Sequence, residues 1–198
     1  MNLMEYEIRL LPEFEDWLDG LKDQLAQEAV AERLIRASRG NFGDHKSVND
    51  GVSELRIRYG AGFRAYYTIR DREIVFMLVG GTKRTQDRDI ARAKRLAKEL
   101  RGQMALKTKA FEPERYFQTE DAQIRLVSNA LESGDTAFLT DAIGIVARAR
   151  GIAEIAEKTG LSRQALYAAF GPKGNPTIST VMKVLGVLGL TLEVKKAA

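Results

Sequence analysis

The sequence predicts an α+β domain, built as a small antiparallel sheet with helices, followed by an all-α domain that contains a helix-turn-helix. Between residues 53 and 80, apolar and polar side chains alternate in two segments and then become continuously apolar, as in neighbouring strands of one sheet. Beyond residue 119 the apolar side chains recur at helical spacing instead. The 198 residues suffice for two domains of about 100 residues each.

The first half alternates strands and helices. Residues 6–11 predict a strand, and Pro12 suits the first turn of the helix that follows. A second helix is expected from about Leu25 to Ser38, with Gly40 near its end. Three strands are then expected at 53–59, 63–70 and 74–80, and a last helix carries Ile90, Ala93, Ala97 and Leu100 on one face.

The second half is predicted to be helical after a polar segment. Thr119, Asp135 and Ser162 each suit the N-cap of a helix. The expected core positions are Ile124, Val127 and Leu131 in the first of these helices and Ile178, Val181, Leu185 and Leu188 in the last, before a short terminal strand at "LTLEV".

We therefore expect domains at residues 1–101 and 119–198, joined by a linker or arm at 102–118. Met104 is interpreted as the first residue of a segment that was once translated separately. In the arm, Phe111, Tyr116 and Phe117 are the residues expected to pack across the first domain.

Composition excludes several classes of site. The chain has no cysteine and one histidine, so neither a disulfide nor a zinc site is expected. We expect a cytoplasmic protein, because no apolar run is long enough to span a membrane and no secretion signal begins the chain. We also expect no cofactor. The net charge is +4, but residues 51–84 hold seven Lys and Arg against three acids.

These cations predict a charged face on the sheet. If the inner face packs on the helices, the other face presents Arg56, Arg58, Arg64, Tyr66, Lys83 and Arg84. Such a face suits a phosphate backbone, and Tyr66 is expected to stack on an RNA base. From periodicity alone, alternating arginines on a strand usually indicate only the solvated face of a half-buried sheet.

The blocks "GVSELRIRYGAGFRAYY" and "IVFMLVGGTKRTQDRDIARA" resemble the RelE/ParE superfamily of toxins, in its HigB-like branch, over about residues 3–100. The resemblance implies either an mRNA endoribonuclease that acts on the ribosome or a ParE-like poison of DNA gyrase. It also implies catalytic roles for Arg64, Lys83, Arg56, Arg58 and Arg84.

In the ribonuclease hypothesis, the RNA 2′-OH attacks the adjacent phosphorus and the 5′-oxygen leaves. Arg64 would stabilise the charge that grows on the phosphoryl oxygens. Lys83 would move a proton only if burial and neighbouring cations perturbed it. His45, the only histidine of the chain, is expected at the surface.

Residues 152–170, "IAEIAEKTGLSRQALYAAF", have the sequence form of a helix-turn-helix, although an ordinary αα-hairpin has a similar pattern. Gly160 marks the turn and Leu161 its corner. The expected DNA contacts come from the second helix and the loop after it: Ser162, Arg163, Gln164, Tyr167 and Lys173.

This half resembles the HigA-like antitoxins, addiction-module antidote proteins with a Cro/C1-type helix-turn-helix, over 104–198. The sequence hypothesis is a toxin and its antitoxin in one chain. Its partners would be mRNA and the ribosome, operator DNA and a second copy bound through the antitoxin half. A DNA-binding repressor with a non-catalytic N-terminal interaction domain remains the alternative from another class.

Overall fold

The computed structural model describes residues 6–60, 62–71, 74–102, 107–171 and 173–193. The chain forms two compact units, Met1–Pro113 and Glu114–Ala198, and each is described by itself. Met104 lies outside the described residues. No helix of the described segments is long and apolar enough to cross a membrane.

The first unit is built on one mixed sheet with the strand order β2-β3-β4-β5-β1-β6. All pairings are antiparallel except that of β1 with β5, which is parallel. The expected all-antiparallel sheet is therefore corrected, because the first strand lies beside the last of the long strands and runs in the same direction. The strands are β1 (Glu7–Leu10), β2 (His45–Ser47), β3 (Ser53–Ile57), β4 (Phe63–Arg70), β5 (Ile74–Thr82) and β6 (Lys109–Ala110).

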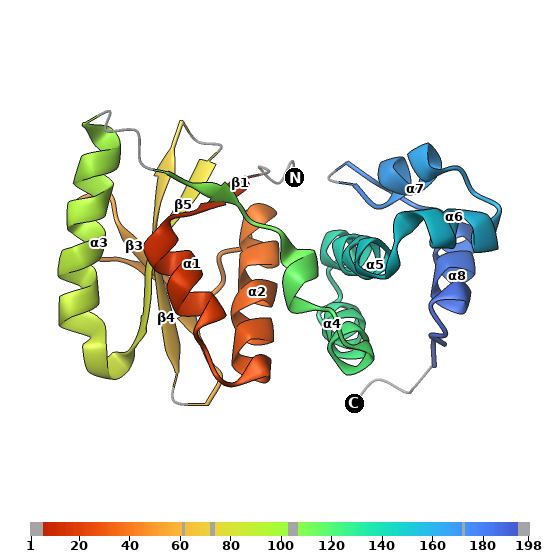
Figure 1. Ribbon diagram of the computed structural model, residues 1–198, viewed down its shortest axis with the longest axis horizontal. Coiled ribbons are helices and arrows are strands. Elements are labelled where there is room, and N and C mark those ends of the chain that lie inside the picture. The colour runs from red at the N-terminus through yellow and green to blue at the C-terminus, as the bar shows by residue number, and fades with distance from the viewer. Residues whose placement is uncertain (1–5, 61, 72–73, 103–106, 172, 194–198) are drawn as a thin grey trace. The chain divides into compact units, whose positions relative to one another are not determined.

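Helices cover both faces of this sheet. Figure 1 shows α3 (Gln86–Arg101) on one face and α1 (Pro12–Asp19) and α2 (Gln24–Ser38) on the other. The α3 side has a core of Tyr66, Leu78, Val79, Ala93, Leu96 and their neighbours. The face that was predicted to be open and cationic is thus largely covered by α3. The apolar side of α3 needs a surface to pack against, and β5, which is apolar on both faces, provides that surface.

Two consecutive glycines in β5 allow this close packing on both faces. A Cβ at Gly80 would lie 1.8 Å from the Trp17 ring, which belongs to α1. A Cβ at Gly81 would lie 2.0 Å from Oδ2 of Asp89, which belongs to α3. Successive residues of a strand point to opposite faces, so each glycine makes room for one helix layer.

The segment that was expected to be an arm contains regular structure. Strand β6 pairs with β1, with Arg9 opposite Ala110 and Leu10 opposite Lys109. A short 3₁₀ turn follows at Pro113–Tyr116. The boundary between the compact units falls within this turn, after Pro113.

The second unit consists of helices α4 (Glu120–Glu132), α5 (Thr136–Arg150), α6 (Ile152–Thr159), α7 (Arg163–Ala169) and α8 (Ile178–Val187). The expected caps are confirmed. Thr119, Asp135 and Ser162 each accept hydrogen bonds from backbone N–H groups in the first turn of their helices. The cap satisfies donors that the helix cannot pair internally.

Parts of the expected core are corrected. Ile124, Leu131 and Ile178 are exposed, and Ile178 retains 71% of its surface. The apolar face of α4 instead centres on Leu126, Val127 and Ala130, because the helix is rotated relative to the simple spacing pattern. The expected terminal strand is absent from residues 190–193; the rest of "LTLEV" lies beyond the described chain.

Candidate functional site

A fully buried carboxylate, Glu54, lies at the centre of the predicted cationic cluster. Its Oε1 accepts a hydrogen bond of 2.8 Å from Nε of Arg56. Its Oε2 accepts from the Tyr66 hydroxyl at 3.2 Å and from Nε2 of Gln86 at 2.9 Å. Nε of Arg64 also lies 3.3 Å from Oε2. A buried charge requires partners of this kind, and here they come from β3, β4 and α3.

Arg64 is held by this carboxylate and is only partly accessible. Its side chain is 15% exposed, and its buried Nε has Glu54 as a neighbour without hydrogen-bond geometry. No residue of the described chain hydrogen-bonds its terminal nitrogens. Arg64 therefore combines a fixed position with an unengaged end of the guanidinium group.

Arg56 and Arg58 are paired with acids. Arg56 lies directly opposite Arg64 across β3 and β4. The hydrogen bond and charge of Glu54 raise the pKa of Arg56. Asp44 lies 3.7 Å from Arg56 and 3.0 Å from Arg58, so the two arginines share this second carboxylate. The structure brings these predicted residues together, but it also neutralises much of their charge.

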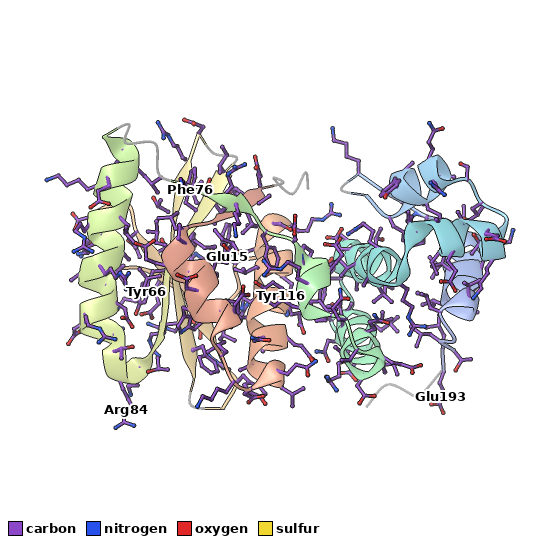
Figure 2. All side chains as sticks on the ribbon, in the orientation of Figure 1. Glu15, Tyr66, Phe76, Arg84, Tyr116 and Glu193 are labelled. Carbon is purple, nitrogen blue, oxygen red and sulfur yellow. The ribbon has the colours of Figure 1, made fainter. Side chains whose placement is uncertain are left out.

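Tyr66 is not available to stack on RNA, which corrects the sequence prediction. Its side chain is fully buried in the α3-side core (Figure 2). Burial, followed by the nearby charge and hydrogen bond of Glu54, raises the pKa of its hydroxyl. Alternation placed Tyr66 on the correct face, but α3 covers that face at this position.

Lys83 and Arg84 extend from the end of β5 into an open depression of about 420 Å³, lined by residues 83–88. Figure 2 shows Arg84 pointing away from the domain beside the start of α3. Neither side chain forms an ion pair with another described residue. Because Lys83 is exposed, it lacks the burial that the proposed proton transfer requires.

A capping box fixes the loop that carries these two cations. Thr82 and Thr85 satisfy each other's backbone and side-chain groups around the turn. The Thr85 hydroxyl donates to Asp89, a buried carboxylate of α3. The loop is thereby positioned at the edge of the α3 layer, next to the end of the strand that pairs with β4.

The only histidine forms no part of this cluster. His45 is exposed in β2, and its Nδ1 lies 2.9 Å from the Gly43 carbonyl oxygen. Within the described segments, no group of three His, Cys, Asp or Glu side chains is arranged to hold a metal ion.

In the second unit, α6 and α7 are joined at Gly160, which has a φ of +71° that favours glycine. Ile155 and Ala156 of α6 and Leu166 of α7 are buried, and the two helices contact each other. A Cβ at Gly144 of α5 would lie 2.6 Å from the Phe170 carbonyl oxygen, so α5 approaches the end of α7 closely. The two helices are therefore packed as one unit against α5.

The predicted DNA-contacting residues share an accessible surface. Ser162, Arg163, Gln164 and Tyr167 are all exposed at α7, and Tyr167 retains 51% of its surface. Lys173 is exposed in the loop that follows. The Ser162 Oγ accepts a hydrogen bond of 3.0 Å from the Ala165 N–H, which occupies the hydroxyl as a cap.

Sequence reasoning missed the acids and the amide that organise the first cluster: Glu54, Asp44, Asp89 and Gln86. One signal was present for Glu54, the only acid among the alternating arginines of its strand. Gln86 is 32 positions away in the chain, so no local pattern indicates its contact with Glu54.

The comparisons with known proteins divide the chain in two. Residues 16–100 match the family described as "Phage derived protein Gp49-like", and residues 107–196 match "Probable addiction module antidote protein". An uncharacterized protein of Haemophilus influenzae is 46% identical over 97 residues, which cover 49% of this chain and 98% of the relative. A second uncharacterized protein of that organism is 39% identical over 80 residues, 40% of this chain and 82% of the relative. No solved structure matches.

The Gp49-like family is of the RelE/HigB toxin type, and the second match is described as an antidote protein of addiction modules. Both are represented here, each over most of one half of the sequence. The chain therefore carries a Gp49-like domain followed by a domain that matches an addiction-module antidote family, and together these matches support a toxin–antitoxin pair.

Proposed function

We propose that the toxin domain is a HigB-like endoribonuclease that cleaves mRNA on the ribosome. The observation that supports this most is Arg64, whose guanidinium is held by the buried Glu54 while its terminal nitrogens remain unengaged. A fixed positive group that needs no reorganisation is suited to stabilise charge that develops during phosphoryl transfer.

The reaction would be a transesterification. The 2′-OH loses its proton to water as its oxygen forms a bond to the adjacent phosphorus. The bond to the 5′-oxygen breaks, that oxygen takes up a proton from water, and a 2′,3′-cyclic phosphate results. Arg64 stabilises the phosphoryl oxygens, while Lys83 and Arg84 bind flanking phosphates at the open depression. Glu54 is engaged by donors from three elements, and its role is to position Arg56 and Arg64.

The test incubates purified residues 1–101 with translating ribosomes and maps the 5′ ends of the mRNA. Arg64→Ala should reduce cleavage about 10²–10³-fold, the usual cost of removing one donor that stabilises transition-state charge. Arg64→Lys should recover only part of the activity, because a lysine lacks the planar fork. Lys22→Ala is the matched control, an exposed cation between α1 and α2.

Absence of cleavage by the folded wild-type domain would overturn this proposal. Inhibition of gyrase supercoiling by the same preparation would then assign the domain to the ParE-like class. With neither effect, the domain would act as an interaction module of a repressor.

We further propose that the antidote domain binds operator DNA and represses its own operon. The supporting observation is that α7 presents Arg163, Gln164 and Tyr167 on one exposed surface, while Leu166 anchors the helix from its other side. Arginine and glutamine are the side chains that pair bidentately with guanine and adenine in the major groove.

Binding of the full chain to DNA from upstream of its own gene tests this second proposal. Arg163→Ala should weaken binding by about 1–3 kcal/mol and relax the preference at one base pair. Lys183→Ala, an exposed cation of α8, is the control. Unchanged affinity of Arg163→Ala would show that α7 is not the recognition helix.

Operator binding by such proteins commonly uses a dimer, and we propose that the antidote domain supplies the contact. Ile178 and Met182 lie four positions apart on α8 and are both exposed, so they form an apolar surface on one side of the helix. A monomeric mass for the DNA-free and DNA-bound full chain would exclude this arrangement.

A further inference from the structure

The edge of the toxin domain's sheet is completed by a strand from a different family. β1 is bonded on one side to β5 and on the other to β6. The Phe111 N–H donates to the Ile8 carbonyl oxygen at 2.9 Å, next to the paired residues of the two strands. Without β6, β1 would present an edge of unpaired backbone groups.

Side chains fix the position of this short strand. The Lys109 ammonium lies 2.9 and 3.1 Å from the two carboxylate oxygens of Glu15, which belongs to α1 and is only 8% exposed. Nε of Arg9 donates to the Thr108 hydroxyl at 2.9 Å. The Lys109–Glu15 ion pair and the Arg9–Thr108 hydrogen bond therefore connect the segment around β6 to the domain, in addition to its backbone hydrogen bonds with β1.

The boundary between the two family matches in the sequence does not coincide with the boundary between the two compact units of the structure. The antidote match begins at residue 107, while the first compact unit extends to Pro113. Residues 107–113 are therefore antidote by sequence, and they are part of the toxin domain by structure.

We propose that the β1 edge, together with Glu15, is the docking site of the toxin domain for its antidote, and that residues 107–111 bind there as an added strand. The backbone ladder provides the attachment, and the Lys109–Glu15 pair fixes the register. This inference depends on the toxin–antitoxin assignment and not on the target that the toxin attacks.

The position of the docking site indicates what it does. In the sheet order, β5 and β1 separate β4 from β6. The added strand thus lies at the opposite end of the sheet from Arg56 and Arg64 and does not cover them. It serves as an anchor that keeps the antidote on the toxin domain, and any direct masking of the arginines must come from another segment.

The experiment starts from the full chain with a specific protease site placed within residues 103–106. Cutting there removes the covalent connection between α3 and β6 while leaving every contact of β6 intact. The two pieces of the wild type should elute together, and the affinity between them is then measured. Before cutting, hydrogen exchange of the Phe111 amide reports whether the strand is paired.

Lys109→Glu should lower the affinity between the pieces at least about tenfold and accelerate exchange at Phe111, because it places a second carboxylate against the poorly exposed Glu15. The matched control is Lys107→Glu, the same change of charge at an exposed residue that forms no ion pair with the described chain. The double variant Glu15→Lys with Lys109→Glu should restore most of the loss.

Two results would overturn the inference. One is an equal effect of Lys109→Glu and Lys107→Glu on affinity, and the other is wild-type exchange at Phe111 as fast as in an unstructured peptide. Neither readout involves RNA cleavage or gyrase, so the docking site and the proposed activity can fail independently.

Discussion

At the scale of single residues, the carboxylate of Glu54 orders the cationic cluster of Arg56 and Arg64 and neutralises part of its charge. Its carboxylate has no exposed surface, and it contacts Arg56, Arg64, Tyr66 and Gln86. Two arginines that face each other across neighbouring strands would otherwise repel. The cluster is therefore a neutralised and ordered group in which the terminal nitrogens of Arg64 form no hydrogen bond with the described part of the chain.

Glu54→Gln should destabilise the toxin domain by about 3 kcal/mol, because it leaves partly buried guanidinium groups without their counter-charge. Chemical unfolding monitored within the toxin domain measures this. Asp44→Asn removes a half-buried partner of Arg58 and Arg56 and should cost less than about 1 kcal/mol. Equal costs for the two variants would show that Glu54 has no special role.

The raised pKa of Tyr67, a buried residue of β4, predicts how the stability of the toxin domain changes at alkaline pH. Burial raises its pKa from 10.0 to about 12. Between pH 10 and about 12 the Tyr67 hydroxyl therefore stays protonated in the folded state but ionises in the unfolded state. The contribution of Tyr67 to the free energy of unfolding is complete below pH 10 and is lost as the pH rises toward 12. Tyrosinate absorbance and unfolding at a series of pH values test this, and Tyr67→Phe should flatten the dependence across that window. The raised pKa of Tyr66 acts in the same direction.

The arginines of the cluster could be predicted from the sequence, because alternation along a strand assigns residues to a face. The burial of Tyr66 and Glu54 could not be predicted in this way. It depends on α3, which begins 20 positions after Tyr66 and 32 positions after Glu54 and whose docking side is decided by packing.

At the scale of elements, the two glycines of β5 control how closely the helices approach. Gly80→Ala should destabilise the toxin domain by about 1–3 kcal/mol, since its Cβ would overlap the Trp17 ring. Gly186→Ala is a contrasting variant in α8, where nothing lies within 4 Å of the added atom. It should stabilise its own domain by about 0.5–1 kcal/mol. Calorimetry that resolves the two domains compares them.

The long strands and the helix caps were predictable because their signals are local. The short strands β2 and β6 were not, since three and two residues are too few to show a period. Their formation depends on a neighbouring edge that the sequence pattern does not reveal. The rotation of α4 and the exposure of Ile178 have the same origin, because tertiary packing selects the buried side of a helix.

At the scale of the whole molecule, the covalent connection should suppress the toxin. A short linker provides an effective antidote concentration in the range of about 1 mM, far above that of a separate chain. Induction of the full chain should therefore arrest growth much less than induction of residues 1–101. Supplying residues 104–198 on a second plasmid should relieve the arrest by the isolated toxin.

Growth arrest of equal strength by the full chain and by residues 1–101 would contradict this prediction. The variant Lys109→Glu in the full chain separates tethering from docking. If the added strand is the anchor, this variant should restore part of the toxicity while Lys107→Glu should not.

The pairing of β1 with β6 also sets an order of events during synthesis. Ile8 leaves the ribosome about 100 residues before Phe111, its partner in the ladder. At a translation rate of about 5–20 residues per second, β6 is synthesised roughly 5–20 s after β1. The nascent toxin domain therefore passes through a period with an open edge, and the first residues of the antidote close it before the helices of the antidote have been made.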